Sequence, residues 1–213
     1  MTVDPATAAS VSGTARFDGP APRRPLVDMT MDPGCKGANQ AEGVVVDGDK
    51  LANVFVYVKS GLEARAFAIP SPITIEQSGC RYRPHVAGAM VGQMVRFVNS
   101  DSTTHNIHPN PKNNREWNES QMPQGPPVEK TFAHPETMMQ VKCNQHPWMT
   151  MYLNVVNSPF FAVTGADGRF EIAGLPPGDY TLGFVQERLG MREVKISLRA
   201  KENATVDVNF KVE

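Results

Sequence analysis

Concentrated positive charge, long apolar runs and a secretory leader are all missing from this chain. Its formal net charge is −1 and its longest basic cluster is Arg23-Arg24, which is too little for a phosphate-binding face. No apolar run approaches the ~20 residues that a membrane-spanning helix needs. Residues Met1 to Pro5 lack the basic start and the apolar stretch of a secretory signal. We therefore expect no nucleic acid partner and no membrane span and, if the protein is exported, a signal that has been removed.

Enzyme signatures are also scarce. The chain has no P-loop, no dinucleotide-binding glycine fingerprint and no recognisable Ser-His-Asp set. We therefore expect the protein not to be an enzyme.

Helical periodicity is nearly absent, and short alternating runs take its place. Glycine (17 residues) and proline (18 residues) interrupt the chain at short intervals. Between them apolar residues recur at every second position, as at Val54, Val56 and Val58, which is typical of β-strands. Only residues 61–67 could form a short helix. The pattern predicts an all-β protein.

Metal-binding side chains are concentrated in the run Lys142-Cys-Asn-Gln-His-Pro-Trp-Met149. Here Cys143, His146 and Met149 offer a thiolate, an imidazole and a thioether, and upstream His105 can supply a second imidazole. Soft sulfur together with imidazole favours copper over magnesium or calcium. These four residues therefore predict a mononuclear copper site, with one ion per chain.

The same residues carry a resemblance to a known family. The loop Cys143-Asn-Gln-His-Pro-Trp-Met149 resembles the short copper-binding loop of the amicyanin-type members of the amicyanin- and plastocyanin-like cupredoxins. The segment from Gly92 to His108 is similar to the strand and turn that carry the first histidine in that family. The resemblance implies a Greek-key β-sandwich whose blue (type 1) copper carries one electron between redox partner proteins.

The resemblance also implies roles for single residues. His105 would be the first histidine ligand, with His108 as its rival, and Asn106 would bond across to the Cys143 loop. Met149 would be the axial ligand, whereas a longer, plastocyanin-like loop would use Met151. An exposed edge of a histidine ligand would admit the electron.

Other residues near the site keep simpler interpretations. Trp148, with Pro147, would form an apolar rim near His146 or would pack in the core. His85 and His134 are expected to be surface or structural histidines. Residues 112–127 are polar and rich in proline, and we expect a long loop there.

A second pattern follows in the last third of the chain. The segment Thr164 to Leu182 resembles the carboxypeptidase regulatory-like (transthyretin-like) β-sandwich, with turns at Asp167-Gly168 and Pro176-Pro-Gly178. Strands of that family's kind also lie before the cupredoxin-like segment. We therefore predict a cupredoxin-like domain over 72–157, inserted in a sandwich formed by 10–71 plus 158–213; two domains in series are the alternative.

The chain has three cysteines, of which Cys143 belongs to the metal loop. We hypothesise that Cys35 and Cys80 form a disulfide, which would fit an oxidising compartment such as a bacterial periplasm. The alternative is two independent buried thiols.

The leading functional hypothesis is a one-electron carrier. Eleven methionines motivate an alternative, copper storage or delivery, because thioethers bind Cu(I). A third possibility is that the second sandwich is a docking module of a larger redox complex.

Overall fold

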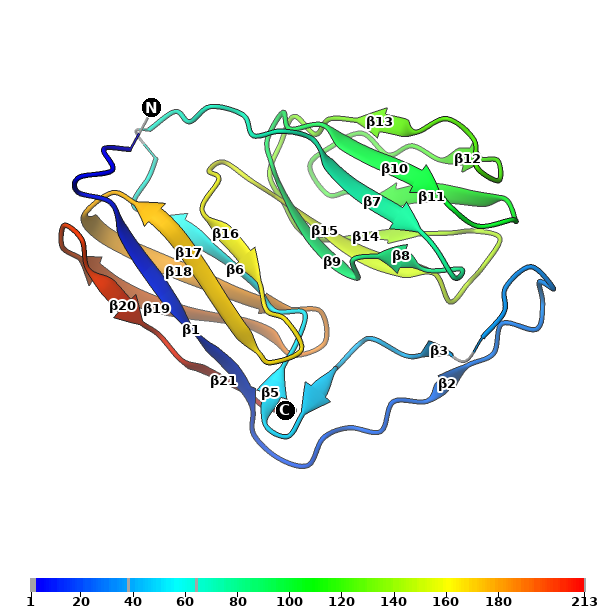
Figure 1. Ribbon diagram of the computed structural model, residues 1–213, viewed down its shortest axis with the longest axis horizontal. Helices are drawn as coiled ribbons and strands as arrows, with labels where there is room; N and C mark the ends of the chain where they lie inside the picture. Colours follow the sequence, from blue (N-terminus) through cyan, green and yellow to red (C-terminus); the bar gives the residue numbers. More distant parts are fainter. Residues whose placement is uncertain (1–2, 38, 64, 213) are drawn as a thin grey trace. The chain divides into compact units, whose positions relative to one another are not determined.

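The computed structural model describes residues 3–37, 39–63 and 65–212, and it is all-β, as predicted (Figure 1). Within these ranges no residue is in a helix, including the described part of 61–67, where a short helix was considered. No helix of the described chain is long and apolar enough to cross a membrane.

The chain forms two compact units. Unit one comprises Met1–Arg23, Gly43–Ala68 and Ser158–Glu213, and unit two comprises Arg24–Glu42 and Ile69–Asn157. The predicted domains differ from these units in one main segment, because residues 24–42 were assigned to the outer sandwich and the structure groups them with unit two. We call Arg24–Glu42 the strap.

Unit one consists of two sheets around one core. The larger sheet has the order β17-β1-β5-β4, with β20 and β21 also paired to β1, and the smaller has the order β16-β6-β18-β19. These strands are β1 (Ala9–Phe17), β4 (Val46–Asp47), β5 (Lys50–Leu51), β6 (Phe55–Ser60), β16 (Phe161–Val163), β17 (Arg169–Leu175), β18 (Gly178–Gln186), β19 (Gly190–Leu198), β20 (Asn203–Thr205) and β21 (Val208–Phe210).

The alternation of apolar and polar residues in the sequence of unit one corresponds to alternating burial of their side chains. On β17, Phe170 and Ile172 are buried while their neighbours Arg169 and Glu171 are exposed, which is the two-residue period of a strand with one face on a core. The turn before β17 requires glycine at position 168, where φ is +70° and a Cβ atom would lie 2.6 Å from a backbone oxygen. The predicted hairpin glycine is therefore needed both for conformation and for space.

Unit two also has two main sheets around a core of its own. Their orders are β13-β10-β7-β8 and β12-β11-β14-β15-β9, and a two-stranded ribbon, β2-β3, lies in the strap. The strands are β2 (Leu26–Val27), β3 (Asn39–Gln40), β7 (Ile73–Gln77), β8 (Tyr82–Arg83), β9 (Val86–Met90), β10 (Val95–Asn99), β11 (His105–Asn110), β12 (Glu119–Gln121), β13 (Val128–Lys130), β14 (Glu136–Lys142) and β15 (Thr150–Val156). The β12 strand lies inside residues 112–127, which were expected to be loop throughout.

Two antiparallel pairings position the residues of the predicted metal site. Strand β11 pairs with β14, with His108 opposite Lys142, and β14 pairs with β15, with Val141 opposite Met151. The start of β11 and the end of β14 therefore lie at the same edge of the sheet. The loop that connects β14 to β15 turns at this edge.

The strap is joined covalently to the rest of unit two. Cys35 and Cys80 form a disulfide with a Cα–Cα distance of 5.5 Å, which agrees with the hypothesis from the sequence. A side-chain contact adds to this link, since Arg81 forms an ion pair with Glu42 at 3.1 Å.

Candidate metal centre

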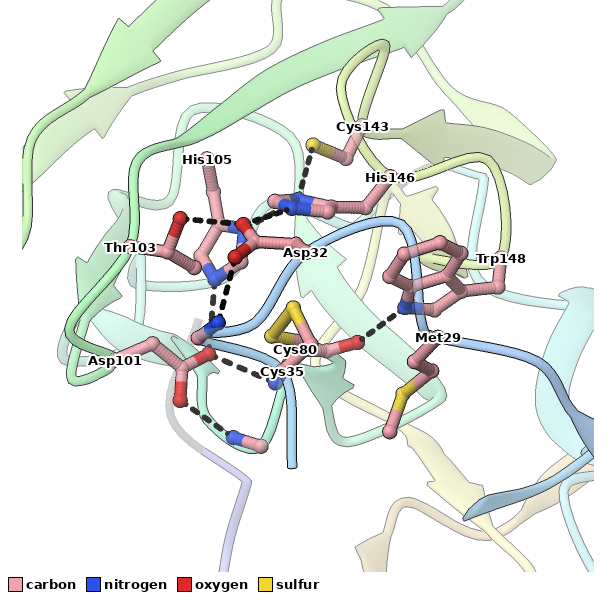
Figure 2. Close-up of a disulfide and its surroundings, with 12 residues drawn as sticks. Met29, Asp32, Cys35, Cys80, Asp101, Thr103, His105, Cys143, His146 and Trp148 are labelled. Atoms are coloured by element: carbon pink, nitrogen blue, oxygen red, sulfur yellow. Dashed lines mark hydrogen bonds and ion pairs between the residues drawn. A yellow bond between two sulfur atoms is a disulfide. The ribbon is translucent and has the colours of Figure 1, made fainter. Parts of the chain in front are cut away.

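Three predicted ligands meet at the edge where β11 begins and β14 ends. His105 is the first residue of β11, Cys143 directly follows β14, and His146 lies in the loop that leads to β15. Their donor atoms all lie within 4.8 Å of one another, and all three residues are buried (Figure 2). The strand pairing thus brings together side chains that are 38 and 41 positions apart in the sequence.

The loop from Cys143 to Met149 closes on itself through its backbone. The Met149 N–H donates to the His146 carbonyl at 2.9 Å, and the Cys143 N–H donates to the Met149 carbonyl at 3.1 Å. These two bonds hold the loop in a tight turn, so the spacing of its side chains is set by the backbone.

Asn106 links the two segments that carry the donors. Its backbone N–H points at the Cys143 Sγ at 3.5 Å, and its side-chain carbonyl accepts the Asn144 N–H at 2.6 Å. The Cys143 thiol also lies 3.2 Å from that carbonyl oxygen. Asn106 therefore bonds across to the loop, the role that the sequence indicated for it.

Each histidine presents the same ring nitrogen to the cluster. The two Nδ1 atoms of His105 and His146 are 2.9 Å apart, and the His146 Nδ1 lies 3.5 Å from the Cys143 Sγ. The opposite nitrogen of each ring contacts a carboxylate: His105 Nε2 lies 2.8 Å from Asp101, and His146 Nε2 lies 2.8 Å from Asp32.

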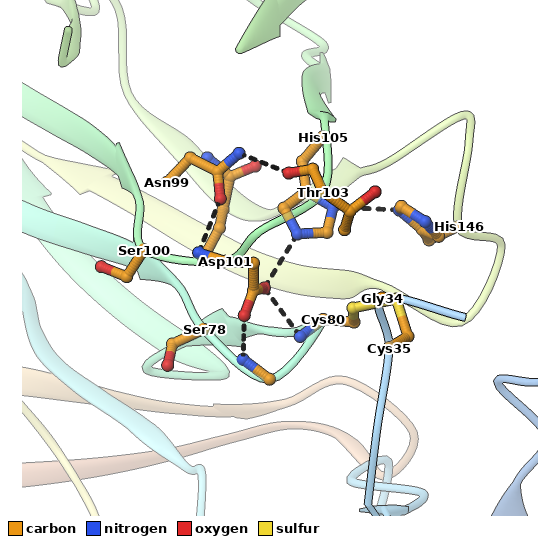
Figure 3. A network of polar contacts seen from close by, with 12 residues as sticks. Gly34, Cys35, Ser78, Cys80, Asn99, Ser100, Asp101, Thr103, His105 and His146 are labelled. Carbon is orange, nitrogen blue, oxygen red and sulfur yellow. Dashed lines mark hydrogen bonds and ion pairs between the residues drawn. A yellow bond between two sulfur atoms is a disulfide. The ribbon is translucent and has the colours of Figure 1, made fainter. Parts of the chain in front are cut away.

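The two carboxylates act as hydrogen-bond acceptors. Asp101 accepts the backbone N–H groups of Gly79 and Cys80 at 2.7 and 2.8 Å (Figure 3). Hydrogen bonds from Thr103 and from His146 lower the pKa of Asp32 to about 2, so this group is ionised at neutral pH. An ionised carboxylate accepts only, which places a proton on the Nε2 atom that faces it.

This arrangement brings the Nδ1 atoms of the two rings face to face. Burial lowers the pKa of His105, against the opposing effect of its hydrogen bond to Asp101, so its neutral form is favoured. A neutral imidazole with its proton on Nε2 has an unprotonated Nδ1. The Nδ1 lone pair of His105 then lies 2.9 Å from the Nδ1 of His146, a place that favours a cation, either a proton or a metal ion.

The donor set therefore fits a metal ion. Nitrogen and thiolate ligands lie about 2.0–2.3 Å from a bound first-row ion such as zinc, so donors of one ion are at most about 4 Å apart. The Nδ1–Nδ1 distance of 2.9 Å and the His146 Nδ1–Cys143 Sγ distance of 3.5 Å satisfy this limit, and all three donor atoms lie within 4.8 Å of one another. Two imidazoles and one thiolate suit copper or zinc and do not suit magnesium or calcium.

The other predicted residues lie as follows. Met149 is 1% exposed and belongs to the same buried core as Cys143, and its rival Met151 is fully buried on β15. Trp148 is half-buried; its ring centroid lies 5.2 Å from that of His146, and its Nε1 donates to the Cys80 carbonyl at 3.2 Å. Trp148 thus has a place both beside His146 and in the packing of the site.

The remaining histidines have other surroundings. His108, the rival of His105, contacts Asn144 at 3.0 Å and Glu116 at 2.6 Å. His85 lies 3.7 Å from Glu42. Neither these two nor His134 belongs to a metal-type cluster among the described residues.

One expectation about the site is wrong. A histidine ligand was expected to expose an edge, but His105 is 0% exposed and His146 is only 3% exposed. Asp32 and Trp148 contact the His146 ring. Asp32 and Asp101 were also not foreseen as partners of the histidines. For Asp32, the hypothesised Cys35–Cys80 disulfide was the one feature of the sequence that could have indicated this contact. Such a bond would hold residues near Asp32 close to the strands of unit two.

No protein-family model matches the chain, and no curated protein sequence matches it. Several solved structures resemble part of it. A Cu-containing nitrite reductase from Thermus scotoductus SA-01 is 22% identical over 45% of this chain and 26% of its own length, with a TM-score of 0.38. A purple cupredoxin from Nitrosopumilus maritimus is 25% identical over 40% of this chain and 99% of its own, with a TM-score of 0.34. A mutant of amicyanin with Cu(I) is 19% identical over 47% and 97%, with a TM-score of 0.35.

These likenesses place cupredoxins among the structures that the chain resembles, over less than half of its length. None of these three structures bears on the resemblance of Thr164 to Leu182 to a transthyretin-like sandwich, which stays a prediction. The expectation that the protein is not an enzyme is corrected, because the similar structures include a nitrite reductase, of which this chain covers about a quarter. Resemblance to this fold does not distinguish carriers from enzymes.

Proposed function

We propose that the protein binds one copper ion per chain through His105, Cys143, His146 and Met149 and serves as a one-electron carrier between redox partner proteins. One observation carries the proposal. The Nδ1 atoms of His105 and His146 lie 2.9 Å apart beside the buried Cys143 thiol, and the Nε2 atom of each ring contacts a carboxylate. A buried cation would be held between the two nitrogens, and the thiolate would add the soft ligand that copper prefers.

When bound, copper would supply exchange between Cu(II) and Cu(I). The protein would supply a site that changes little between these two states. The Asn106 amide fixes the loop through the Asn144 N–H, and the backbone N–H of Asn106 points at the Cys143 sulfur. Hydrogen bonds to the ligand sulfur and a buried, largely dry setting are among the features that tune such a centre.

The compartment belongs to the same proposal. The Cys35–Cys80 disulfide supports export to an oxidising compartment such as a bacterial periplasm. Unit one, with its own core and the transthyretin-like turn pattern, would then serve as the docking module that selects a redox partner.

Copper storage or delivery is the second candidate, and exposed thioethers favour it. Met31 in the strap and Met122, just after β12, are 74% and 66% exposed, although large apolar side chains are usually covered. Thioethers on the surface could receive or release Cu(I).

Titration of the metal-free protein with Cu(II) tests the proposal. We expect one tightly held ion per chain, reversible reduction, and an intense visible thiolate-to-copper band. The band should be absent in Cys143→Ala, absent or strongly changed in His146→Ala, and altered but present in Met149→Leu. His108→Ala is the matched control and should keep the band unchanged.

Two outcomes count against the carrier. A protein that stays colourless at every Cu(II) concentration would not have the proposed site. Several labile Cu(I) ions per chain, released at similar rates, would favour storage or delivery, and Met31→Leu should then lower the stoichiometry.

A further inference from the structure

A carboxylate from the strap lies directly against the second predicted histidine ligand. The Asp32 Oδ2 atom is 2.8 Å from the His146 Nε2, although the two residues are 114 positions apart (Figure 2). No other described carboxylate contacts this ring, because Asp101 bonds to the other histidine. The strap thus provides His146 with a partner that the sheet strands of unit two do not.

Asp32 is held in place by several contacts. Thr103 donates to its Oδ2 at 2.6 Å, and the Gly34 N–H donates to its Oδ1 at 2.7 Å. The Cys35 N–H donates to the Asp32 carbonyl at 2.9 Å, which forms a turn, and Cys35 is itself joined to Cys80 by the disulfide. The disulfide is therefore three residues from the carboxylate and anchors it beside the site.

The strap and Trp148 together cover the imidazole. His146 is 3% exposed, and the Asp32 side chain is 23% exposed, so the carboxylate lies between the ring and solvent. A carboxylate acceptor at Nε2 orients the ring so that Nδ1 faces Cys143. A ring without this partner could rotate, and water could reach it.

We propose that Asp32 is a positioning residue for His146: carried by the disulfide-anchored strap, it orients the ring toward the metal cluster and closes the site against metal exchange. This inference rests on the proposed copper function. Carboxylate partners of histidine ligands fix the ring and raise its basicity, and their loss typically weakens metal binding about 10–100-fold.

The first test needs no metal. Because Asp32 accepts the Nε2 proton in a buried place, this proton should give a slowly exchanging ring N–H signal in nitrogen-15 NMR of the metal-free protein. We expect the signal in the wild type and its loss in Asp32→Ala. Asp28→Asn is the matched control, because Asp28 lies in the same strap and, among the described residues, its side chain bonds to Thr30 within that strap.

The second test measures copper. We expect Asp32→Ala to bind Cu(II) about 10–100-fold more weakly than the Asp28→Asn control and to lose copper faster to a chelator. Its reduction potential should also rise, because a negative charge that stabilises Cu(II) is removed. Thr103→Val, which leaves Asp32 in the chain but removes a donor to it, should weaken copper binding and speed copper loss by less.

The outcomes separate this inference from the proposed function. If the wild type shows no visible band but its ring N–H is protected by Asp32, the copper function fails and the orienting role survives. If Asp32→Ala keeps the ring signal, or keeps a copper affinity within about twofold of Asp28→Asn, the inference is overturned. Should Asp32→Ala not fold, as judged by tryptophan fluorescence, Thr103→Val decides by the same criteria.

Discussion

At the scale of single residues, the site depends on buried and partly buried polar side chains that each have a specific partner. Asn106, Asp32 and Asp101 all lie beside the metal-type cluster without being among its predicted ligands. A buried polar group without its partner costs about 1–3 kcal/mol, so removing such residues should affect stability as well as copper binding.

Removing the Asn106 side chain should destabilise unit two. Asn106→Ala leaves the Asn144 N–H without its acceptor, and we expect a loss of about 1–3 kcal/mol in the free energy of unfolding. Urea unfolding followed by tryptophan fluorescence measures this, because both tryptophans, Trp117 and Trp148, lie in unit two. Asn118→Ala, which removes only the partner of the far amide nitrogen, should cost less; equal losses would contradict the prediction.

Glu136 should make the stability of unit two depend on pH. Burial raises the pKa of this carboxyl, but hydrogen bonds from Asn113, Asn114 and the Lys112 N–H outweigh it and leave the pKa below 4.5. A lowered folded-state pKa stabilises the protein above the unfolded value, and this contribution is lost as pH falls through the folded-state pKa. Glu136→Gln should therefore destabilise unit two by about 1–3 kcal/mol at pH 7 and progressively less below about pH 4.5.

The exposed Glu129 provides the comparison for Glu136. It forms a surface ion pair with Arg96 at 2.7 Å, a kind of contact that contributes about 0–1 kcal/mol. Unfolding of Glu129→Gln and Glu136→Gln should be followed at pH 7 and at pH 3. If the difference in free energy of unfolding between the wild type and Glu136→Gln stayed constant from pH 7 to pH 3, the ionised carboxylate could not be the cause of that difference.

At the scale of elements, strand pairing brings the donor atoms together. Strands β11 and β14 pair with each other, and the Tyr82 hydroxyl contacts the carbonyl of Asn106 at 2.6 Å and that of Lys142 at 3.2 Å. Each of these carbonyls is next to a predicted ligand in sequence. Tyr82 therefore joins the two strand ends that carry His105 and Cys143.

Tyr82→Phe should loosen these strand ends. Loss of one buried hydroxyl donor is expected to cost about 1–2 kcal/mol in unit two and to speed hydrogen exchange near Asn106 and Cys143. Tyr180→Phe is the matched control, because it loses a comparable bond, to the Pro176 carbonyl at 2.6 Å, in unit one. If Tyr180→Phe shifted the tryptophan transition as far as Tyr82→Phe, the effect would not belong to the strand ends.

At the scale of the whole molecule, two units with separate cores share one chain, and unit two is assembled from two separate segments. The Cys35–Cys80 disulfide spans 45 positions and joins these segments. Such a cross-link limits the freedom of the unfolded chain, and its loss typically costs about 2–5 kcal/mol.

Replacing both cysteines by serine should therefore act on unit two alone. Cys35→Ser with Cys80→Ser should lower the urea midpoint seen by tryptophan fluorescence by the equivalent of about 2–4 kcal/mol. Hydrogen exchange in β17 and β18, which belong to unit one, should stay as in the wild type. An equal loss of protection in both units would show that they unfold together.

The fold class was predictable from local patterns, and the ligand set was proposed largely from them. A two-residue period along Val54, Val56 and Val58 reflects strand geometry, which depends only on neighbouring residues. The spacing of Cys143, His146 and Met149 is likewise local, because one short loop holds all three. The choice of His105 over His108 as the first histidine ligand depended on the family resemblance as well, since nothing in that segment excluded His108.

Only the tertiary structure decided what surrounds these donors. Asp32 reaches His146 across 114 positions, and the strap that carries it belongs to unit two although residues 43–68 separate it from the rest of that unit. A single carboxylate in a turn has no periodicity or spacing that marks its distant partner. Its role follows from strand pairing and one disulfide, which act between segments that the local sequence does not relate.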